Sequence, residues 1–302
     1  MTAVVALGGN ALMRPGERGT AAEQRANLRE VCAALRPLLD EPEIVITHGN
    51  GPQVGNELLR HERAADEAPP LPLYLAVAQT QAEIGALIES ELEPIAGRPV
   101  VCLLTHVLVA EDDPAFEKPT KPIGPFYAED EARKLEQDRG WKVVHDAGRG
   151  WRRVVPSPQP LEVVEVDAIR ALLRSGAIVI ACGGGGIPAA RRGAHLAGVD
   201  AVIDKDRASA LLARELGADR LVILTEVPAV YRGFGTDSQE ELRQLSADEA
   251  EAVLPGLAAG SMRPKVEASV DFVRATGHEA LITSPAALAE ALSGGAGTRI
   301  TA

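Results

Sequence analysis

Three glycine-rich turns follow apolar runs of the sequence, and their backbone amides could hold an anion. The candidate residues are Gly8, Gly9 and Asn10, then Gly49, Asn50 and Gly51, and finally Gly183, Gly184, Gly185 and Gly186. Glycine has no Cβ, so a ligand can lie directly against the peptide N–H groups, as phosphate does in phosphate-binding loops. One such turn would be ordinary turn chemistry, but three in one chain favour a shared anion site over that alternative.

Lysines at three places could neutralise the charge of a bound polyphosphate. Lys205 lies between Asp204 and Asp206 at the start of a predicted helix, where the two acids could instead act only as helix caps. Lys265 also lies near a predicted helix start, where the helix dipole disfavours a cation unless an anion is bound. For Lys121, in KPTKPIGPF, a solvated loop lysine and a ligand contact are equally open.

Other kinds of catalytic centre find no support in the sequence. Ser157 and Ser175 lack a GxSxG setting, and no HExxH, GxxxxGK[ST], HRD or DFG motif is present. The three cysteines lack CxxC spacing, and the six histidines lack the spacing of metal ligands. We therefore predict no metal held by the protein and no disulfide framework, and we interpret Cys182 as a small buried residue.

Composition limits the class of partner. The 302 residues are 46% hydrophobic, which suits one large α/β domain or two small ones. A formal net charge of -12 argues against nucleic acid or an anionic membrane surface as the partner. The N-terminus lacks the basic start of a signal peptide, and no segment has the roughly 20 apolar residues of a membrane helix. We expect a cytoplasmic protein with a small anionic ligand.

Strand-like and helix-like segments alternate along the chain. Apolar runs without alternation are typical of strands buried on both faces. Such runs lie at residues 3–7, 43–47, 100–104, 177–181, 221–225 and 280–283. Helical spacing of apolar residues lies between them, at residues 20–39, 74–92 and 207–216. This order predicts a mostly parallel sheet between helices, with ligands at the carboxyl ends of the strands.

A proline-rich segment from about residue 111 to residue 160 interrupts this order. It contains only a short predicted helix, near residues 128–137. We interpret the segment as an excursion from the main sheet, either a small subdomain or a lid.

Seven stretches closely resemble the carbamate kinases, a branch of the amino acid kinase family, in the expected order along the chain. They are VVALGGNA (4–11), THGNGPQVGN (47–56), PTKPIGPF (119–126), DAGRGWRRVVPSP (146–158), CGGGGIP (182–188), AVIDKD (201–206) and GSMRPKVEA (260–268). The resemblance implies one α/β domain over residues 1–302. This domain would be a three-layer αβα sandwich with an open, mainly parallel eight-stranded sheet and a protruding subdomain at 111–160.

The resemblance also implies an activity. It is reversible phosphoryl transfer between ATP and carbamate, giving ADP and carbamoyl phosphate. Magnesium (Mg²⁺) would be bound mainly through the nucleotide phosphates, and the enzyme would be a homodimer. In cells that ferment arginine or agmatine, or degrade purine-derived carbamoyl groups, this family usually works towards ATP.

Roles for single residues follow from the same resemblance. The turns at 8–10 and 49–51 would hold the transferring phosphoryl group and the carbamate, and the glycines at 183–186 would lie against the bound ligands. Because the ligands lie there, that segment would need a bare backbone. The nucleotide would be bordered by Thr225, Tyr231 and Met262.

The lysines would supply the charge. Lys205 and Lys265 would contact the phosphates, with Lys265 on the nucleotide side. Asp206 would orient both lysines, and Lys121 would reach in from the protruding subdomain as it closes over the small substrate.

Two positions depart from related patterns. Many amino acid kinases have a lysine two residues before the first Gly-Gly pair, where this chain has Ala6; carbamate kinases share this absence. Where they usually read Thr-Gly-Val-Asp, residues 225–228 read Thr-Glu-Val-Pro, which could alter nucleotide binding or merely stiffen a loop. Two alternatives stay open, a related kinase with another small acid as acceptor and a nucleotide-binding regulator that has lost catalysis.

Overall fold

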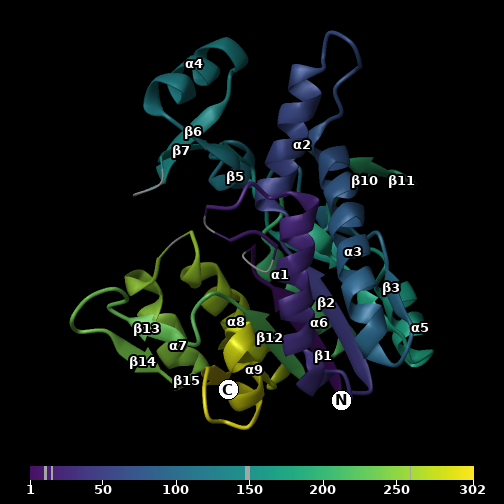
Figure 1. The fold of residues 1–302 in the computed structure, drawn as a ribbon, viewed down its shortest axis with the longest axis vertical. Helices are drawn as coiled ribbons and strands as arrows, with labels where there is room; N and C mark the ends of the chain where they lie inside the picture. Colours follow the sequence, from purple (N-terminus) through teal and green to yellow (C-terminus); the bar gives the residue numbers. More distant parts are fainter. Residues whose placement is uncertain (10–11, 15, 147–149, 259) are drawn as a thin grey trace.

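An eight-stranded sheet forms the centre of the molecule (Figure 1). The structure is a computed structural model that describes residues 1–9, 12–14, 16–146, 150–258 and 260–302. The strands lie in the order β15 (Gln244–Ser246), β17 (Thr298–Thr301), β16 (Glu279–Thr283), β12 (Arg220–Leu224), β1 (Thr2–Leu7), β2 (Glu43–His48), β9 (Ile178–Ile180) and β3 (Val100–Cys102). All neighbours are parallel except β16 and β17. The predicted mainly parallel eight-stranded sheet is confirmed.

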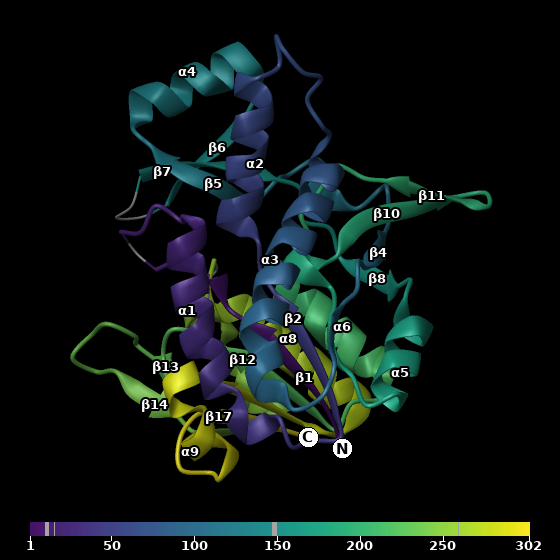
Figure 2. The same cartoon turned by 45° about the vertical axis from the view of Figure 1, so that its right-hand side comes forward.

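Helices cover both faces of this sheet, as Figures 1 and 2 show. One face packs against α1 (Ala21–Ala34), α3 (Leu73–Ala96) and α9 (Leu288–Leu292). The other packs against α5 (Val166–Arg174), α6 (Lys205–Leu216), α7 (Ala247–Val253) and α8 (Met262–Thr276). Successive residues of β1 belong to the two cores in turn, Val4 to one and Val5 to the other, because strand side chains alternate between faces. The three-layer αβα sandwich is therefore confirmed.

Capping residues explain where the main helices begin and end. Thr20 and Glu23 form a capping box at the start of α1, in which each side chain accepts a hydrogen bond from the other residue's backbone N–H. Asp204 occupies the N-cap position of α6, as Thr20 does in α1. Gly217 ends α6 and Gly277 ends α8, both in the left-handed conformation that favours glycine.

Smaller elements lie around the central sheet in the described part of the chain. A four-stranded sheet has the order β11 (His195–Gly198), β10 (Ile187–Arg192), β4 (His106–Val109) and β8 (Pro160–Val163). A hairpin pairs β13 (Val230–Arg232) with β14 (Glu240–Leu242), and a three-stranded sheet has the order β5 (Lys121–Tyr127), β7 (Gly150–Val155) and β6 (Lys142–Asp146). The remaining helices are α2 (Gly51–Arg63), α4 (Glu129–Arg139) and the short 3₁₀ turns η2 (Arg36–Leu38), η3 (Pro114–Phe116), η4 (Gly183–Gly185), η5 (Leu254–Gly256) and η6 (Pro285–Ala287).

The three-stranded sheet and α4 stand apart from the central sheet, beside α2 (Figures 1 and 2). They lie within the predicted subdomain at 111–160, although β8 at its end pairs with β4 in the four-stranded sheet. This sheet meets α2 where two glycines touch: a Cβ on Gly55 would overlap the Cα and N atoms of Gly124. The operation of 111–160 as a separate unit stays a prediction.

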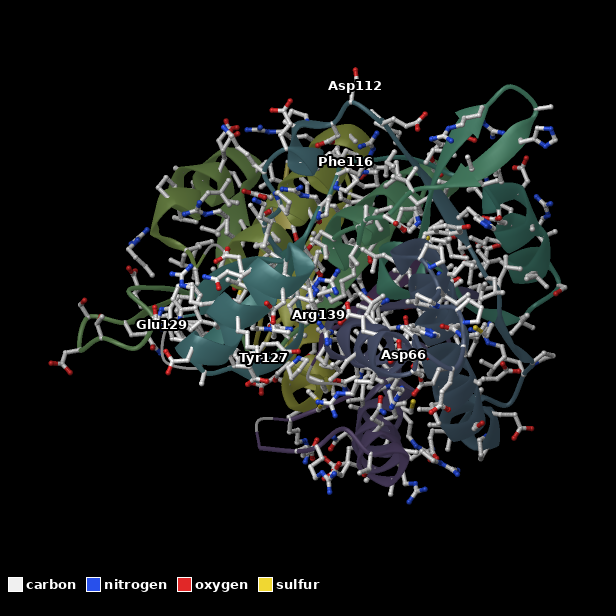
Figure 3. The ribbon with its side chains drawn as sticks, turned by 90° about the horizontal axis from the view of Figure 1, so that it is seen from above. Asp66, Asp112, Phe116, Tyr127, Glu129 and Arg139 are labelled. Atoms are coloured by element: carbon white, nitrogen blue, oxygen red, sulfur yellow. The ribbon has the colours of Figure 1, made fainter. Side chains whose placement is uncertain are left out.

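Charged and aromatic side chains extend this contact towards α4. Figure 3 shows this region from above, with Glu129 and Arg139 of α4 labelled. Glu62 of α2 pairs with Arg139 and, at 2.9 Å, with Arg153. Both guanidinium groups also lie over the ring of Trp141, at 5.8 Å and 4.6 Å from its centroid. These contacts hold the three-stranded sheet and α4 against α2 from Gly55 to Glu62. Among the described helices, none is long and apolar enough to cross a membrane.

Candidate active site

The second glycine turn joins the end of β2 to the start of α2. A Cβ on Gly49 would lie 3.2 Å from Cδ of Lys205, so the stem of this lysine lies against the turn. Asn50 directly precedes α2, and Gly51 is its first residue. The Cβ position of Gly51 is 3.8 Å from the carbonyl oxygen of Pro122 in β5. The turn therefore touches both the start of α6 and the three-stranded sheet.

Lys205 and Lys265 share one carboxylate, that of Asp206. Nζ of Lys265 donates to Oδ2 at 2.9 Å, and Nζ of Lys205 donates to Oδ1. All three residues are less than one tenth exposed. Lys265 lies in the first turn of α8, where Asp206 supplies the anion that offsets the unfavourable helix dipole. The structure thus brings the two lysines together, while their contact with phosphate stays a prediction.

Asp204 has two sets of partners. Its Oδ1 accepts from the backbone N–H of Asp206 at 2.9 Å and of Arg207 at 3.3 Å, which caps α6. Its Oδ2 accepts from Nζ of Lys121 at 2.5 Å. Sequence reasoning considered Asp204 only as a cap and missed this ion pair with a residue of β5. Three cations and two anions therefore meet here, which leaves one net positive charge.

Burial and pairing set the protonation of this cluster. Burial lowers the pKa of Lys205 to about 8, against the pull of Asp206. Burial would raise the pKa values of Asp204 and Asp206, but the adjacent ammonium groups hold both below their usual range. Burial also acts against the charge of Lys265, yet Asp206 outweighs it and the pKa of Lys265 is raised. At neutral pH Asp204, Asp206, Lys205 and Lys265 are therefore charged, and of Lys205 and Lys265 the former is nearer to losing its proton.

The glycine run at 183–186 is packed by protein atoms on the side where side chains would lie. Cβ atoms on these four glycines would overlap, in order, atoms of His48, Asn50, Ile203 and Val107. The last three glycines also have φ values between +65° and +89°, in the left-handed region. The bare backbone is therefore required by the packing of the loop itself, which corrects the expectation that bound ligands explain it. A ligand contact through the amides stays a prediction.

The first glycine turn follows β1. A Cβ on Gly8 would lie 2.8 Å from the carbonyl oxygen of Leu224, so β12 requires glycine there. Gly9 is exposed, and no described atom lies within 4 Å of its Cβ position. Thr225, which follows β12, lies beside Gly8. Asn10, the third residue of the predicted turn, lies outside the described residues.

The other two predicted nucleotide contacts lie on separate elements. Tyr231 belongs to β13, and its ring centroid is 5.9 Å from that of Phe234. Met262 is the first residue of α8, packs against the core and precedes Lys265 by three positions. Met262 thus shares α8 with Lys265 of the lysine cluster, and the roles of Tyr231 and Met262 in nucleotide binding stay predictions.

The three cysteines are free thiols. Cys32 and Cys182 are buried and Cys102 is partly buried. Burial raises the pKa of all three, to about 12 for Cys32 and about 11 for Cys102. The interpretation of Cys182 as a small buried residue is confirmed.

Comparison with known proteins places this chain in a family. The sequence pattern of the amino acid kinase family matches residues 1–284. The chain belongs to this family. Among its amino acid kinase relatives, the carbamate kinase of Halobacterium salinarum is 47% identical over 300 residues, which span 98% of this chain and 97% of that protein.

Solved structures agree with this placement in the amino acid kinase family. Carbamate kinase from Giardia lamblia bound to citric acid matches with a TM-score of 0.94 and 40% identity, over 99% of this chain and 98% of that one. The same enzyme bound to AMP-PNP matches with a TM-score of 0.90, at the same identity and coverage. The chain is therefore an enzyme of the carbamate kinase type, and the resemblance seen in the sequence is confirmed.

Proposed function

We propose that this enzyme transfers a phosphoryl group reversibly between ATP and carbamate, and that it works towards ATP in the cell. The observation that carries this proposal is the buried lysine cluster beside the turn at 49–51, together with the family placement. Carbamoyl phosphate is a mixed anhydride, so its phosphoryl group passes readily to ADP. The cells that would use this direction are those that break down arginine, agmatine or purine-derived carbamoyl groups.

The chemistry asks the protein mainly for position and charge. Phosphoryl transfer has a loose transition state whose charge spreads over the phosphoryl oxygens. Lys205 and Lys265 would bind those oxygens, and because Asp206 already fixes both ammonium groups, little reorganisation is needed during the reaction. Carbamate is itself a nucleophilic anion, so no general base is required. Lys121 would leave Asp204 to bind the small substrate.

The backbone would complete the anion site. We propose that the amides of the turns at 8–10 and 49–51 hold the transferring phosphoryl group and the carbamate, since Lys205 lies directly against the second turn. The amides of 183–186 would face the same ligands. Thr225, Tyr231 and Met262 would border the nucleotide.

A magnesium ion fits this site only through the nucleotide. In the described residues no group of three histidine, cysteine or acidic side chains is placed to hold a metal, and Asp204 and Asp206 are both engaged by lysines. We propose that phosphate oxygens hold Mg²⁺, which would supply further charge neutralisation. We further propose a cytoplasmic homodimer; the three free thiols support the cytoplasmic location, and they do not bear on the oligomeric state.

The direct test mixes the purified chain with ADP, Mg²⁺ and carbamoyl phosphate and follows ATP formation. Rapid ATP formation is expected with carbamoyl phosphate. Acetyl phosphate, which lacks the amino group, serves as the matched control donor and should react more slowly. Equal rates with the two donors would remove carbamate as the specific acceptor. Binding of ADP without any ATP formation would contradict the proposal and favour a regulatory protein.

The alkaline side of the pH profile should report Lys205. Below pH 8 this lysine is protonated in the empty enzyme; above it the ammonium that the transition state needs is lost. We expect kcat/KM for ATP formation to fall about tenfold per pH unit above about pH 8, because this constant reports the free enzyme. Anionic substrates raise the pKa, so the fall in kcat should lie at higher pH. Lys205→Arg keeps its charge at all these pH values and should lose the fall; an unchanged profile would contradict the assignment.

A further inference from the structure

Two adjacent residues of α3 each hold one of the glycine-rich turns. Thr80 and Gln81 are 0% and 1% exposed. Oγ1 of Thr80 accepts a hydrogen bond from Nδ2 of Asn50 at 2.9 Å. Nε2 of Gln81 donates to the carbonyl oxygen of Gly183 at 2.9 Å. A buried polar pair in the middle of an otherwise largely apolar helix face is costly unless it is hydrogen-bonded, and here each bond ends on a different turn.

Two donors fix the direction of the Gly183 carbonyl: Nε2 of Gln81 and, at 3.0 Å, the backbone N–H of Gly186 in the same loop. In a trans peptide the C=O and N–H groups point in opposite directions, and no cis bond occurs in the described chain. Because the Gly183 carbonyl is directed at α3, the N–H of Gly184 is directed away from it. The short helix η4 contacts α6 as well as α3, so an N–H directed away from α3 is placed to face α6, which begins with Lys205.

The bond to Thr80 acts on the start of α2. Asparagine before a helix usually caps it through its side chain, but the Asn50 side chain makes no such bond here. It is turned to Thr80 and lies under Gly184, whose Cβ would overlap it. The first backbone N–H of α2 with a helical partner is that of Val54, at 2.8 Å from the Asn50 carbonyl. Pro52 has no N–H, so the earlier amides are those of Gly51 and Gln53, which have no hydrogen-bond partner among the described residues and could face an anion beside Lys205.

A third buried contact acts in the same way. Nδ1 of His48 lies 3.0 Å from the carbonyl oxygen of Gly49, and burial lowers the pKa of this imidazole to about 4, so it is neutral. With the proton on Nδ1, the ring donates to Gly49 and turns the next N–H, that of Asn50, the other way. The same peptide logic therefore applies to both turns.

We propose that Thr80 and Gln81 are positioning residues, which aim the amides of the turns at 49–51 and 183–186 at the substrates without touching them. Gln81 is fixed in turn by the backbone N–H of Thr105, which donates to its Oε1 at 2.6 Å. Thr80 is fixed by its own helix, through the carbonyls of Ala76 and Val77. This inference rests on the proposed function, and it adds the residues that prepare the anion site.

The test compares Thr80→Val, Thr80→Ser and Gln81→Met with the unaltered enzyme in ATP formation. Valine and methionine keep the volume and lose the hydrogen bond, whereas serine keeps the hydroxyl. Thr80→Val should raise the KM for carbamoyl phosphate about tenfold and change the KM for ADP less than about twofold. Thr80→Ser should leave the KM for carbamoyl phosphate close to that of the unaltered enzyme. Gln81→Met should lower kcat about tenfold or more, as a lost amide donor does.

Hydrogen exchange of the same variants gives a readout that needs no activity. Thr80→Val should speed exchange in a peptide covering residues 49–54, and Gln81→Met in one covering 181–187. If the variants only melt earlier and the folded enzyme keeps its kinetic constants, the residues are structural and the proposal fails. If the unaltered enzyme forms no ATP, the proposed function fails, while unchanged exchange in both peptides would separately overturn the positioning role.

Discussion

Lys205→Ala is expected to lower kcat for ATP formation on the order of 100-fold or more, the loss typical for removal of one group that stabilises transition-state charge. The fold should survive, because Asp206 keeps Lys265 as a partner at 2.9 Å and no buried charge is left alone. ADP binding, followed by calorimetry, should persist in the variant. Activity and binding together therefore separate loss of chemistry from loss of structure.

The matched control is Lys134→Ala, which removes an exposed lysine of α4. Its kcat should stay close to that of the unaltered enzyme. A loss of less than tenfold in Lys205→Ala would refute the role given to Lys205. A similar loss of kcat in both variants would show that the effect comes from the change in net charge rather than from the lysine cluster.

Gly55→Ala is expected to lower kcat/KM about 100-fold, since displacement by about 1 Å of a group far from the chemistry can have that effect. A Cβ on Gly55 would overlap the Gly124 backbone and lie 3.0 Å from the carbonyl carbon of Ile123, so β5 must move away from α2. Lys121 begins β5 and would move with it. Alanine has the higher helix propensity, by about 1 kcal/mol, so a lower melting temperature could come only from this overlap.

Gly256→Ala provides the comparison for this substitution. No described atom lies within 4 Å of its Cβ position, and its φ is not in the left-handed region. It should melt and turn over like the unaltered enzyme. Equal behaviour of the two glycine variants would show that the contact between α2 and β5 does not position Lys121.

Most strands of the central sheet could be predicted from the sequence, because the inner strands are buried on both faces and form continuous apolar runs. The runs at 43–47 and 221–225 lie within two residues of β2 and β12. The strands β15 and β17 were not predicted, because they are only three and four residues long, lie towards one edge of the sheet and include polar residues. Short edge strands gain their identity from neighbours rather than from hydrophobicity.

The sequence predicted charged groups that the structure brings together, but it did not predict the residues that hold the glycine-rich turns. Motif resemblance singled out Lys205, Lys265 and Asp206, which the structure brings together. The pairing of Lys121 with Asp204 joins residues 83 positions apart, and no local pattern reports such a contact. Thr80 and Gln81 did leave a signal, two uncharged polar residues on the buried side of a helix whose other buried residues are nearly all apolar.

The burial of the three thiols has a consequence for oxidative stress. Hydrogen peroxide and disulfide-forming reagents attack the thiolate, and with their pKa raised by burial these cysteines remain protonated at neutral pH. The groups proposed to carry charge in the reaction are ammonium, carboxylate and amide groups, which such oxidants do not readily modify, whereas Met262, proposed to border the nucleotide, has an oxidisable thioether. As far as thiols are concerned, we expect the proposed phosphoryl transfer to persist without a reducing agent, under conditions in which thiol-dependent enzymes are oxidised.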